Sequence, residues 1–154
     1  MLTNRRTIRI EWGDCDPAGI VYFPRYFEYF DACTSALFES AGLHLPEMMK
    51  LSAVNGIPMV DIKTRFLIPS RFGDEVIMES SIAKWGRSSF VVQHRILKGD
   101  ALAAECFETR VWVVHPDGDS QKFESRPIPE EVKERFAAGV PARSLTNSPT
   151  HSTT

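Results

Sequence analysis

The spacing of apolar residues takes a helical period in one segment near the N-terminus. From Phe23 to Ala41 the pattern predicts a helix face that carries Phe23, Phe27, Phe30, Thr34, Phe38 and Ala41. Pro24 suits the first helical turn, whose N–H groups lack partners, and Gly42 stands where a C-terminal cap would lie. The pattern therefore predicts one long helix over residues 23–41.

Strand-like alternation of apolar and polar residues occurs on both sides of this helix. A short alternation from Thr7 to Trp12 precedes the helix, and four longer strand candidates follow it, over residues 60–68, 75–85, 89–97 and 101–115. Residues 45–56 show no clear pattern, and residues 129–138 suit a short terminal helix. This order predicts an α+β fold, with one helix on one face of a five-stranded, mainly antiparallel sheet.

The size of the chain suits one domain. It has 154 residues, of which 43% are hydrophobic, so we expect a single domain over residues 1–138. Residues 139–154 are rich in Ser, Thr and Pro and predict a tail. One helix covers such a sheet only in part and leaves its edge strands open. We therefore expect a homodimer or homotetramer, with a monomer whose edge is covered by a loop as the alternative.

Composition and charge exclude several classes of protein. The net charge of −2 disfavours a nucleic-acid binder, and no apolar run is long enough to span a membrane. The N-terminus lacks the apolar stretch of a signal peptide, and the cysteines are odd in number and widely spaced (Cys15, Cys33 and Cys106). These features predict a cytoplasmic protein. Since the chain has no metal-ligand cluster and no phosphate-binding glycine motif, we expect no metal and no cofactor.

The histidines and serines show no arrangement that is typical of catalysis. The four histidines (His44, His94, His115 and His151) are isolated, and His94 on its predicted strand is best interpreted as a packed or solvated residue. Ser88 and Ser89 lack the glycine-flanked elbow of a serine hydrolase. The candidate chemistry therefore lies elsewhere.

The loop before the long helix holds the candidate catalytic group. Asp16 stands a few residues ahead of the helix, whose free N–H groups and dipole favour negative charge. Such a terminus stabilises a carboxylate or the oxyanion of acyl transfer, and Phe23 is the natural donor because Pro24 has no N–H. The alternative is that Asp14 and Asp16 only shape the turn.

The segment from Ile10 to Phe27, continuing to Asp31, closely resembles the opening of the 4-hydroxybenzoyl-CoA thioesterases, a hotdog-fold family. The Asp-Cys-Asp-Pro-Ala-Gly-Ile-Val run is its specific part. A weaker likeness extends the resemblance over residues 7–130, through residues 56–60, 85–90 and 110–112. The resemblance implies a long helix wrapped by a curved antiparallel sheet, assembled as dimers or tetramers.

The resemblance also implies roles for individual residues. It makes Asp16 the catalytic carboxylate and the Phe23 N–H the group that polarises the thioester carbonyl, and it brings Asp31 to the 4-hydroxyl of the aryl group. The other expected substrate contacts are Tyr22, Ile57 and Pro58. The expected contacts to CoA phosphates are Arg87, Ser88, Ser89, Lys122 and Arg126. The chain departs from the family where Gly86 and Ser88 replace charges, Phe23 replaces a tyrosine and Ile57 replaces a threonine.

The implied activity is hydrolysis of 4-hydroxybenzoyl-CoA to 4-hydroxybenzoate and CoA, with an aspartate as nucleophile or general base. Such a reaction belongs to the degradation of aromatic compounds. Two alternatives stay open: a thioesterase for short- or medium-chain aliphatic acyl-CoA, and a non-catalytic acyl-CoA-binding protein. Asp31 distinguishes the aryl substrate from the aliphatic alternative, because burying a carboxylate beside an aliphatic tail costs free energy.

Overall fold

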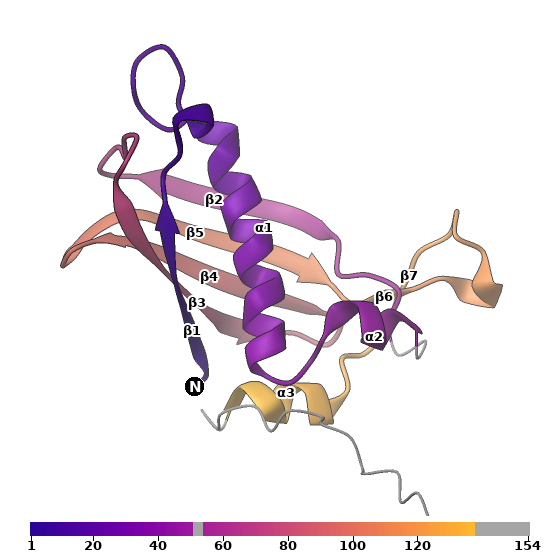
Figure 1. The fold of residues 1–154 in the computed structure, drawn as a ribbon. Coiled ribbons are helices and arrows are strands. Elements are labelled where there is room, and N and C mark those ends of the chain that lie inside the picture. The colour runs from indigo at the N-terminus through magenta and orange to yellow at the C-terminus, as the bar shows by residue number, and fades with distance from the viewer. Residues whose placement is uncertain (51–53, 138–154) are drawn as a thin grey trace, which may run out of the picture.

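The computed structural model describes residues 1–50 and 54–137, in which one long helix packs across a five-stranded sheet (Figure 1). The helix, α1, spans Phe23–Ser40. Every pair of neighbouring strands is antiparallel, in the order β1-β3-β4-β5-β2. The strands are β1 (Thr3–Arg9), β2 (Met59–Phe66), β3 (Glu75–Trp85), β4 (Ser89–Lys98) and β5 (Ala101–Val111). The predicted α+β layout is confirmed.

The first strand differs from its prediction. It ends at Arg9, and Trp12–Asp14 form a short 3-10 helix, η1, with Trp12 76% exposed. The pairing of β1 with β3 runs from Thr3 opposite Ser81 to Arg9 opposite Glu75, which sets the bounds of the strand. Because the residues of Thr3–Arg9 are mostly polar and exposed, hydrophobic alternation predicted only the C-terminal part of this strand, from Thr7 onward.

The C-terminal half is more divided than the sequence pattern predicted. The strand expected over residues 101–115 stops at Val111, and the chain continues into β6 (Val113–Val114), which pairs with β7 (Glu124–Ser125). Three short helices complete the described chain: α2 (Leu45–Lys50), η2 (Pro116–Gly118) and α3 (Glu130–Ala137). The predicted helix at residues 129–138 is thus confirmed over Glu130–Ala137, whereas α2 and the β6–β7 pair were not predicted.

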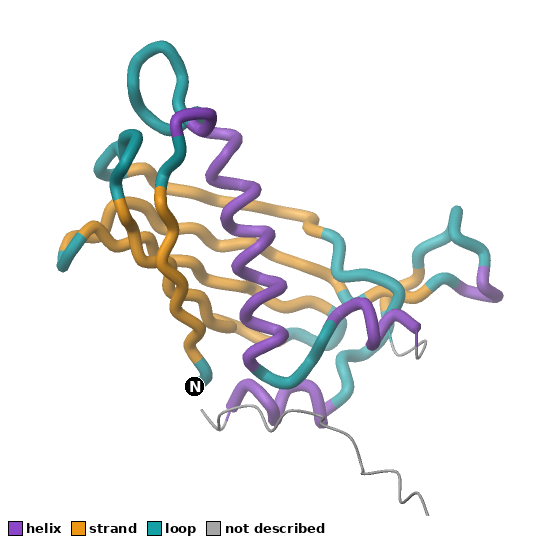
Figure 2. The backbone as a smooth tube through the Cα atoms, viewed as in Figure 1, coloured by secondary structure: helices purple, strands orange, loops and turns teal. Residues whose placement is uncertain are grey.

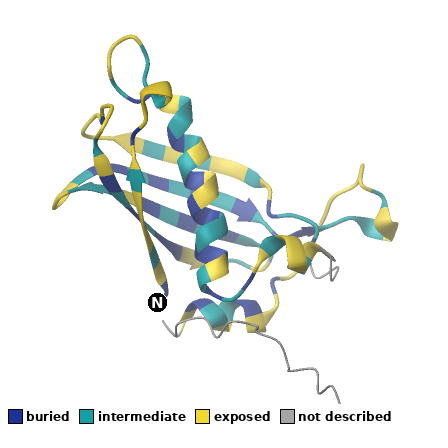
Figure 3. Ribbon diagram, viewed as in Figure 1, coloured by how far each residue is buried: buried dark blue, intermediate teal, exposed yellow. Residues whose placement is uncertain are grey.

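The helix buries the face that meets the sheet (Figure 3). Its buried residues are Tyr26, Phe30, Cys33, Thr34, Leu37 and Phe38. The predicted face was therefore wrong at Phe23, which is 58% exposed, because the first turn of α1 lies beyond the strands that cover the rest of the helix. Phe38 joins the core cluster near the C-terminal end of α1, whereas Phe30 joins a second cluster toward its N-terminal end.

The loop between β1 and α1 projects beyond the end of the sheet (Figure 2). It carries η1 and leads directly into Phe23, so the sheet and helix hold it at both ends.

Among residues 1–50 and 54–137, none of the helices has the length and apolar composition that a membrane-spanning helix needs. The predicted tail, residues 139–154, and the domain limit at residue 138 lie outside the described residues.

Candidate active site

The loop that carries Asp16 is closed by its own backbone. The Asp16 N–H donates to the Ile20 carbonyl at 2.9 Å, and the Gly19 N–H donates to the Asp16 carbonyl at 2.9 Å. Gly19 adopts a φ of 79°, a left-handed conformation that favours glycine. The half-buried Asp16 side chain accepts a hydrogen bond at Oδ1 from the Ala18 N–H at 2.8 Å. The carboxylate therefore has a fixed orientation within the loop.

The start of α1 follows this loop directly. Tyr22 precedes the helix in an extended conformation, with φ −63° and ψ 119°, and Pro24 occupies the first turn. The Tyr22 N–H donates back to the Asp14 carbonyl at 2.8 Å, which fastens the helix start to the loop. Because an α-helix leaves its first N–H groups without partners in the helix and Pro24 has none, the Phe23 N–H is available to a ligand here. Asp16 and Phe23 thus lie at one loop–helix junction, as predicted.

An apolar groove of about 170 Å³ adjoins the helix start. It lies between the first turns of α1 and the segment that follows β2, and its lining includes Phe23, Tyr26, Phe66 and Leu67. Tyr26 and Phe66 have ring centroids 5.0 Å apart, so they join the helix to this segment. Phe23 and Tyr22 are both half exposed or more. This groove is an apolar surface beside the predicted oxyanion donor.

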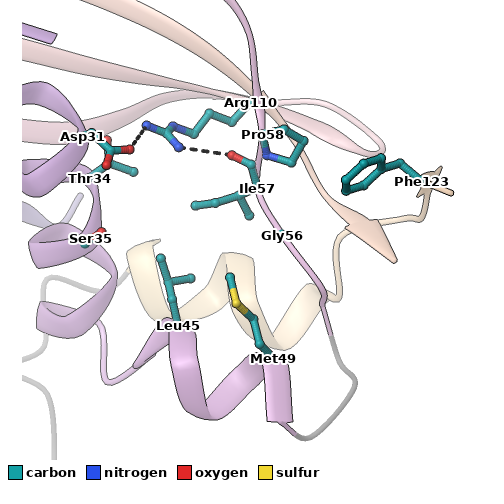
Figure 4. A pocket seen from close by; sticks show the side chains of 10 residues that line it. All are labelled: Asp31, Thr34, Ser35, Leu45, Met49, Gly56, Ile57, Pro58, Arg110 and Phe123. Carbon is teal, nitrogen blue, oxygen red and sulfur yellow. Dashed lines mark hydrogen bonds and ion pairs between the residues drawn. The ribbon is translucent and has the colours of Figure 1, made fainter. Parts of the chain in front are cut away.

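A larger pocket of about 360 Å³ lies farther along α1 (Figure 4). We call it the Asp31 pocket, and its lining is Asp31, Thr34, Ser35, Leu45, Met49, Gly56, Ile57, Pro58, Arg110 and Phe123. It gathers three of the four predicted substrate contacts, Asp31, Ile57 and Pro58, from two separate segments. The fourth, Tyr22, lies at the helix start instead.

Asp31 does not stand alone in this pocket. Its Oδ1 accepts a hydrogen bond from Arg110 Nη2 at 2.9 Å, and Arg110 Nη1 donates to the Ile57 carbonyl at 3.1 Å (Figure 4). The Asp31 side chain is 69% exposed, whereas that of Arg110 is 7% exposed. The carboxylate thus faces the pocket while a buried cation holds it.

Behind Arg110 lies a buried polar cluster that the sequence analysis missed. Arg110 Nε donates to the carboxylate of Glu108, which also pairs with His94 Nε2 and accepts a hydrogen bond from Thr34 Oγ1 at 3.0 Å. On the other side, His94 Nδ1 lies 2.7 Å from Ser80 Oγ. Both His94 and Glu108 are fully buried.

The charge of this cluster follows from its contacts. Burial raises the pKa of the Glu108 carboxyl, but the hydrogen bond and charge of His94, together with Arg110, outweigh burial and hold that pKa below its usual value. Glu108 is therefore a buried carboxylate that pairs with two basic groups. A sequence signal existed: Cys106, Glu108 and Arg110 occupy alternate positions of one strand, so the two charges share a face with a buried residue.

Four of the five predicted CoA contacts, all except Lys122, come from two segments that the fold brings together. The Trp112 N–H donates to the Ser88 carbonyl at 2.7 Å, the Arg126 N–H donates to the Trp112 carbonyl at 3.0 Å, and the Ile128 N–H donates to the Arg87 carbonyl at 2.8 Å. The turn that holds Arg87, Ser88 and Ser89 therefore adjoins the segment of Arg126. Both arginines are exposed, and Arg126 pairs with Glu124.

Lys122 is set apart from this pair of segments. It lies in the connection between β6 and β7, with its Nζ 3.8 Å from a carboxylate oxygen of Asp119. Its carbonyl lies 2.9 Å from His115 Nδ1, which ties the connection to the end of the strand. The hydrogen bonds that join the arginine segments do not include Lys122.

Comparison with known proteins identifies the family. A model of the thioesterase-like superfamily matches residues 10–136. Over 134 residues, covering 82% of this chain and 92% of the relative, the sequence is 33% identical to the 4-hydroxybenzoyl-CoA thioesterase of Pseudomonas sp. (strain CBS-3). It is 24% identical to the 1,4-dihydroxy-2-naphthoyl-CoA hydrolase of Synechococcus elongatus, over 81% of this chain and 88% of that protein.

Solved structures agree with the sequence matches. A 4-hydroxybenzoyl-CoA thioesterase variant in complex with 4-hydroxybenzoyl-CoA superposes with a TM-score of 0.82 and 26% identity, over 89% of this chain and 100% of that one. A gentisyl-coenzyme A thioesterase gives a TM-score of 0.74 with 28% identity, over 84% of this chain and 99% of that one. The chain belongs to the thioesterase-like superfamily, as a hotdog-fold thioesterase of the 4-hydroxybenzoyl-CoA thioesterase family.

Proposed function

We propose that the protein hydrolyses an aryl-CoA thioester, with 4-hydroxybenzoyl-CoA as its substrate, in the cytoplasm, where its three free cysteines would stay reduced. The observation that carries this proposal is the oriented Asp16 carboxylate beside the N-terminus of α1. The relatives named above support an aryl substrate, because their acyl groups are 4-hydroxybenzoyl, dihydroxynaphthoyl and gentisyl.

The chemistry needs two groups at the helix start. The thioester carbonyl oxygen accepts a hydrogen bond from the Phe23 N–H, where the helix dipole favours the negative charge that develops on this oxygen. Asp16 then attacks the carbonyl carbon to form a mixed anhydride, which water hydrolyses, or removes a proton from a water that attacks directly. In both routes the carbon–sulfur bond breaks and CoA leaves as a thiolate, so a strong general acid is not required.

The Asp31 pocket would receive the acyl group. Its apolar side chains, among them Leu45, Met49, Ile57 and Phe123, suit an aromatic ring, and Asp31 would accept a hydrogen bond from the ring hydroxyl. The same apolar lining favours the alternative of an aliphatic acyl chain. An alkyl chain would, however, cover Asp31 and Arg110 without offering either a hydrogen bond, which costs free energy.

We further propose that the working protein is a homodimer or homotetramer that shares its sites between subunits. Asp31 follows Phe23 by eight residues, a rise of about 12 Å along the helix. The turn at Arg87 lies beyond Asp31, beside Phe38 and Phe90. Seen from Phe23, Asp31 and the turn at Arg87 of the same chain lie in one direction along α1. The acyl group and the CoA group extend from a thioester carbonyl in different directions. With the carbonyl at Phe23, one chain therefore cannot bind the acyl group at Asp31 and the CoA group at Arg87, and a second subunit would supply one of these contacts.

A panel of CoA thioesters tests the proposed activity. Purified protein would be assayed for thiol release with 4-hydroxybenzoyl-, benzoyl-, butyryl- and octanoyl-CoA. We expect saturable turnover with 4-hydroxybenzoyl-CoA as the best substrate. A clear preference for the alkyl thioesters would establish the aliphatic alternative. Tight binding of all four thioesters without hydrolysis would identify a non-catalytic acyl-CoA-binding protein instead.

A further inference from the structure

The guanidinium of Arg110 is oriented by three contacts at once. Nε donates to Glu108, Nη1 donates to the Ile57 carbonyl at 3.1 Å, and Nη2 donates to Asp31 Oδ1 at 2.9 Å. The side chain is 7% exposed, so packing as well as hydrogen bonding restricts its movement. Arg110 therefore connects the fully buried Glu108 with the exposed Asp31 in a fixed geometry.

The buried end of this connection is itself fixed. Glu108 contacts His94 and accepts from Thr34 Oγ1, while His94 contacts Ser80 on the neighbouring strand. These residues belong to α1 and to three strands of the sheet, so the whole scaffold determines where the guanidinium lies. An exposed aspartate on a helix would otherwise exchange between rotamers, and orienting it would cost entropy when a ligand binds.

At the pocket, Arg110 and Asp31 together present a hydrogen-bond donor and an acceptor. A guanidinium carries more N–H groups than the three that donate to described residues here, and Arg110 lines the Asp31 pocket. The Asp31 carboxylate only accepts. A ligand group that both donates and accepts therefore matches this pair, whereas a methyl group or an alkyl chain satisfies neither partner.

We infer that Arg110 is a specificity-determining residue, and that the Arg110–Asp31 pair selects acyl groups whose ring carries a neutral hydroxyl. The hydroxyl donates to Asp31 and accepts from Arg110, and Arg110 also keeps the carboxylate aimed into the pocket. A negatively charged ring substituent is rejected, because it would approach the Asp31 carboxylate. This inference rests on the proposed aryl-CoA thioesterase activity, and it adds Arg110 as a residue that selects the ring substituent.

The first test uses the unmodified protein and three ring substituents. The values of kcat/KM would be compared for 4-hydroxybenzoyl-, 4-methylbenzoyl- and benzoyl-CoA. A methyl group has nearly the size of a hydroxyl and forms no hydrogen bond, so it controls for the filling of space. We expect the 4-hydroxy substrate to exceed both others by about tenfold or more, the size of one charged hydrogen bond.

The second test is a double-mutant cycle. Arg110→Lys keeps the positive charge and loses the forked geometry, and Asp31→Ala removes the acceptor. Each single variant should lower the ratio of kcat/KM for 4-hydroxybenzoyl-CoA over benzoyl-CoA by about tenfold, and the double variant should show no further loss. Arg95→Lys, at an exposed arginine on β4, is the matched control and should keep the ratio of the unmodified protein.

These readouts separate specificity from stability and from the activity itself. The ratio of two kcat/KM values does not change with the fraction of protein that is folded, so a purely structural role of Arg110 would lower both values and leave the ratio intact. An intact ratio in Arg110→Lys would overturn the inference. If that variant does not fold, equal rates for the hydroxyl and methyl substrates in the unmodified protein would overturn it. Absence of hydrolysis with every aryl thioester would instead refute the proposed function.

Discussion

Phe38 on α1 packs against Phe90 at the start of β4, with their ring centroids 5.7 Å apart. This contact places the turn that holds Arg87 at the C-terminal end of the helix. Phe23 begins the helix fifteen residues earlier, a rise of about 22 Å. The turn that holds Arg87 and the predicted oxyanion donor therefore lie at opposite ends of α1, with Asp31 between them.

This arrangement predicts that activity depends on assembly. We expect the protein to be a dimer or tetramer at micromolar concentration. Val60 at the open edge strand β2 is 61% exposed, so Val60→Lys should weaken pairing through this edge and lower both the measured mass and the turnover. Sedimentation and thiol-release assays on the same samples would check this. A monomeric mass with full activity in the unmodified protein would contradict the shared site.

The matched control for this variant lies on the other edge strand. Thr7 on β1 is also exposed, and Thr7→Lys adds the same charge to an edge that already carries several arginines. We expect it to leave the mass and the turnover unchanged. Loss of assembly in both variants would point to a general effect of charge rather than to the β2 edge.

The adjacent segments of Arg87 and Arg126 predict a site for the CoA phosphates. Replacing both with Ala should raise KM by about tenfold. The reason is that the binding free energies of two exposed charge contacts add up to roughly the amount that corresponds to a tenfold change in affinity. Because the same contacts act in the ground state and the transition state, kcat should change little. The double variant should also lose the discrimination against a thioester that lacks the 3′-phosphate. Arg95→Ala is the control, and an unchanged KM in the double variant would remove these residues from the CoA site.

The buried Glu108 predicts a defined dependence of stability on pH. Its folded pKa lies below the ordinary 4.5, so its contribution is complete above that pH and is lost as the pH falls through the lower folded pKa. Glu108→Gln leaves Arg110 and His94 without their carboxylate and should lower the free energy of unfolding at pH 7 by about 3 kcal/mol. Urea unfolding should show this difference narrowing as the pH falls below 4.5.

Glu105→Gln is the control for that measurement, because Glu105 lies on the same strand and is only half buried. It should change the free energy of unfolding at pH 7 by well under 1 kcal/mol, as expected for a partly exposed group. A difference between Glu108→Gln and the unmodified protein that stays constant from pH 7 to pH 3 would contradict the assignment of Glu108 as a buried carboxylate.

The sequence predicted the elements whose patterns are strong. The period from Phe23 onward, with Pro24 near its start, predicted the long helix, and the strand predicted over residues 75–85 matches β3. It placed the first strand over residues 7–12, too late by several residues, because the mostly polar residues of β1 show its start only through pairing with β3. The local pattern of apolar and polar residues does not predict which strands pair when they are distant in sequence.

For the candidate site, the sequence named single residues but not the residues that surround them. The motif around Asp16 led to the loop and the helix start, and both are adjacent in the structure. The Glu108 and Arg110 pair was missed, because charges in a strand pattern are ordinarily interpreted as exposed, and only the fold shows that they face α1. Likewise, only the fold shows that the segments of Arg87 and Arg126 meet.

The turnover of Asp16→Asn shows whether Asp16 is the group that attacks the thioester or activates water. Asn keeps an oxygen that can accept the hydrogen bond from the Ala18 N–H, so the loop should fold as before while the nucleophile or base is lost. We predict unchanged binding of 4-hydroxybenzoyl-CoA and a fall in kcat of a hundredfold or more, roughly 3 kcal/mol in the barrier. Asp100→Asn in the exposed β4–β5 turn is the control. Near-normal kcat in a folded Asp16→Asn protein would contradict the role of Asp16 as the catalytic carboxylate.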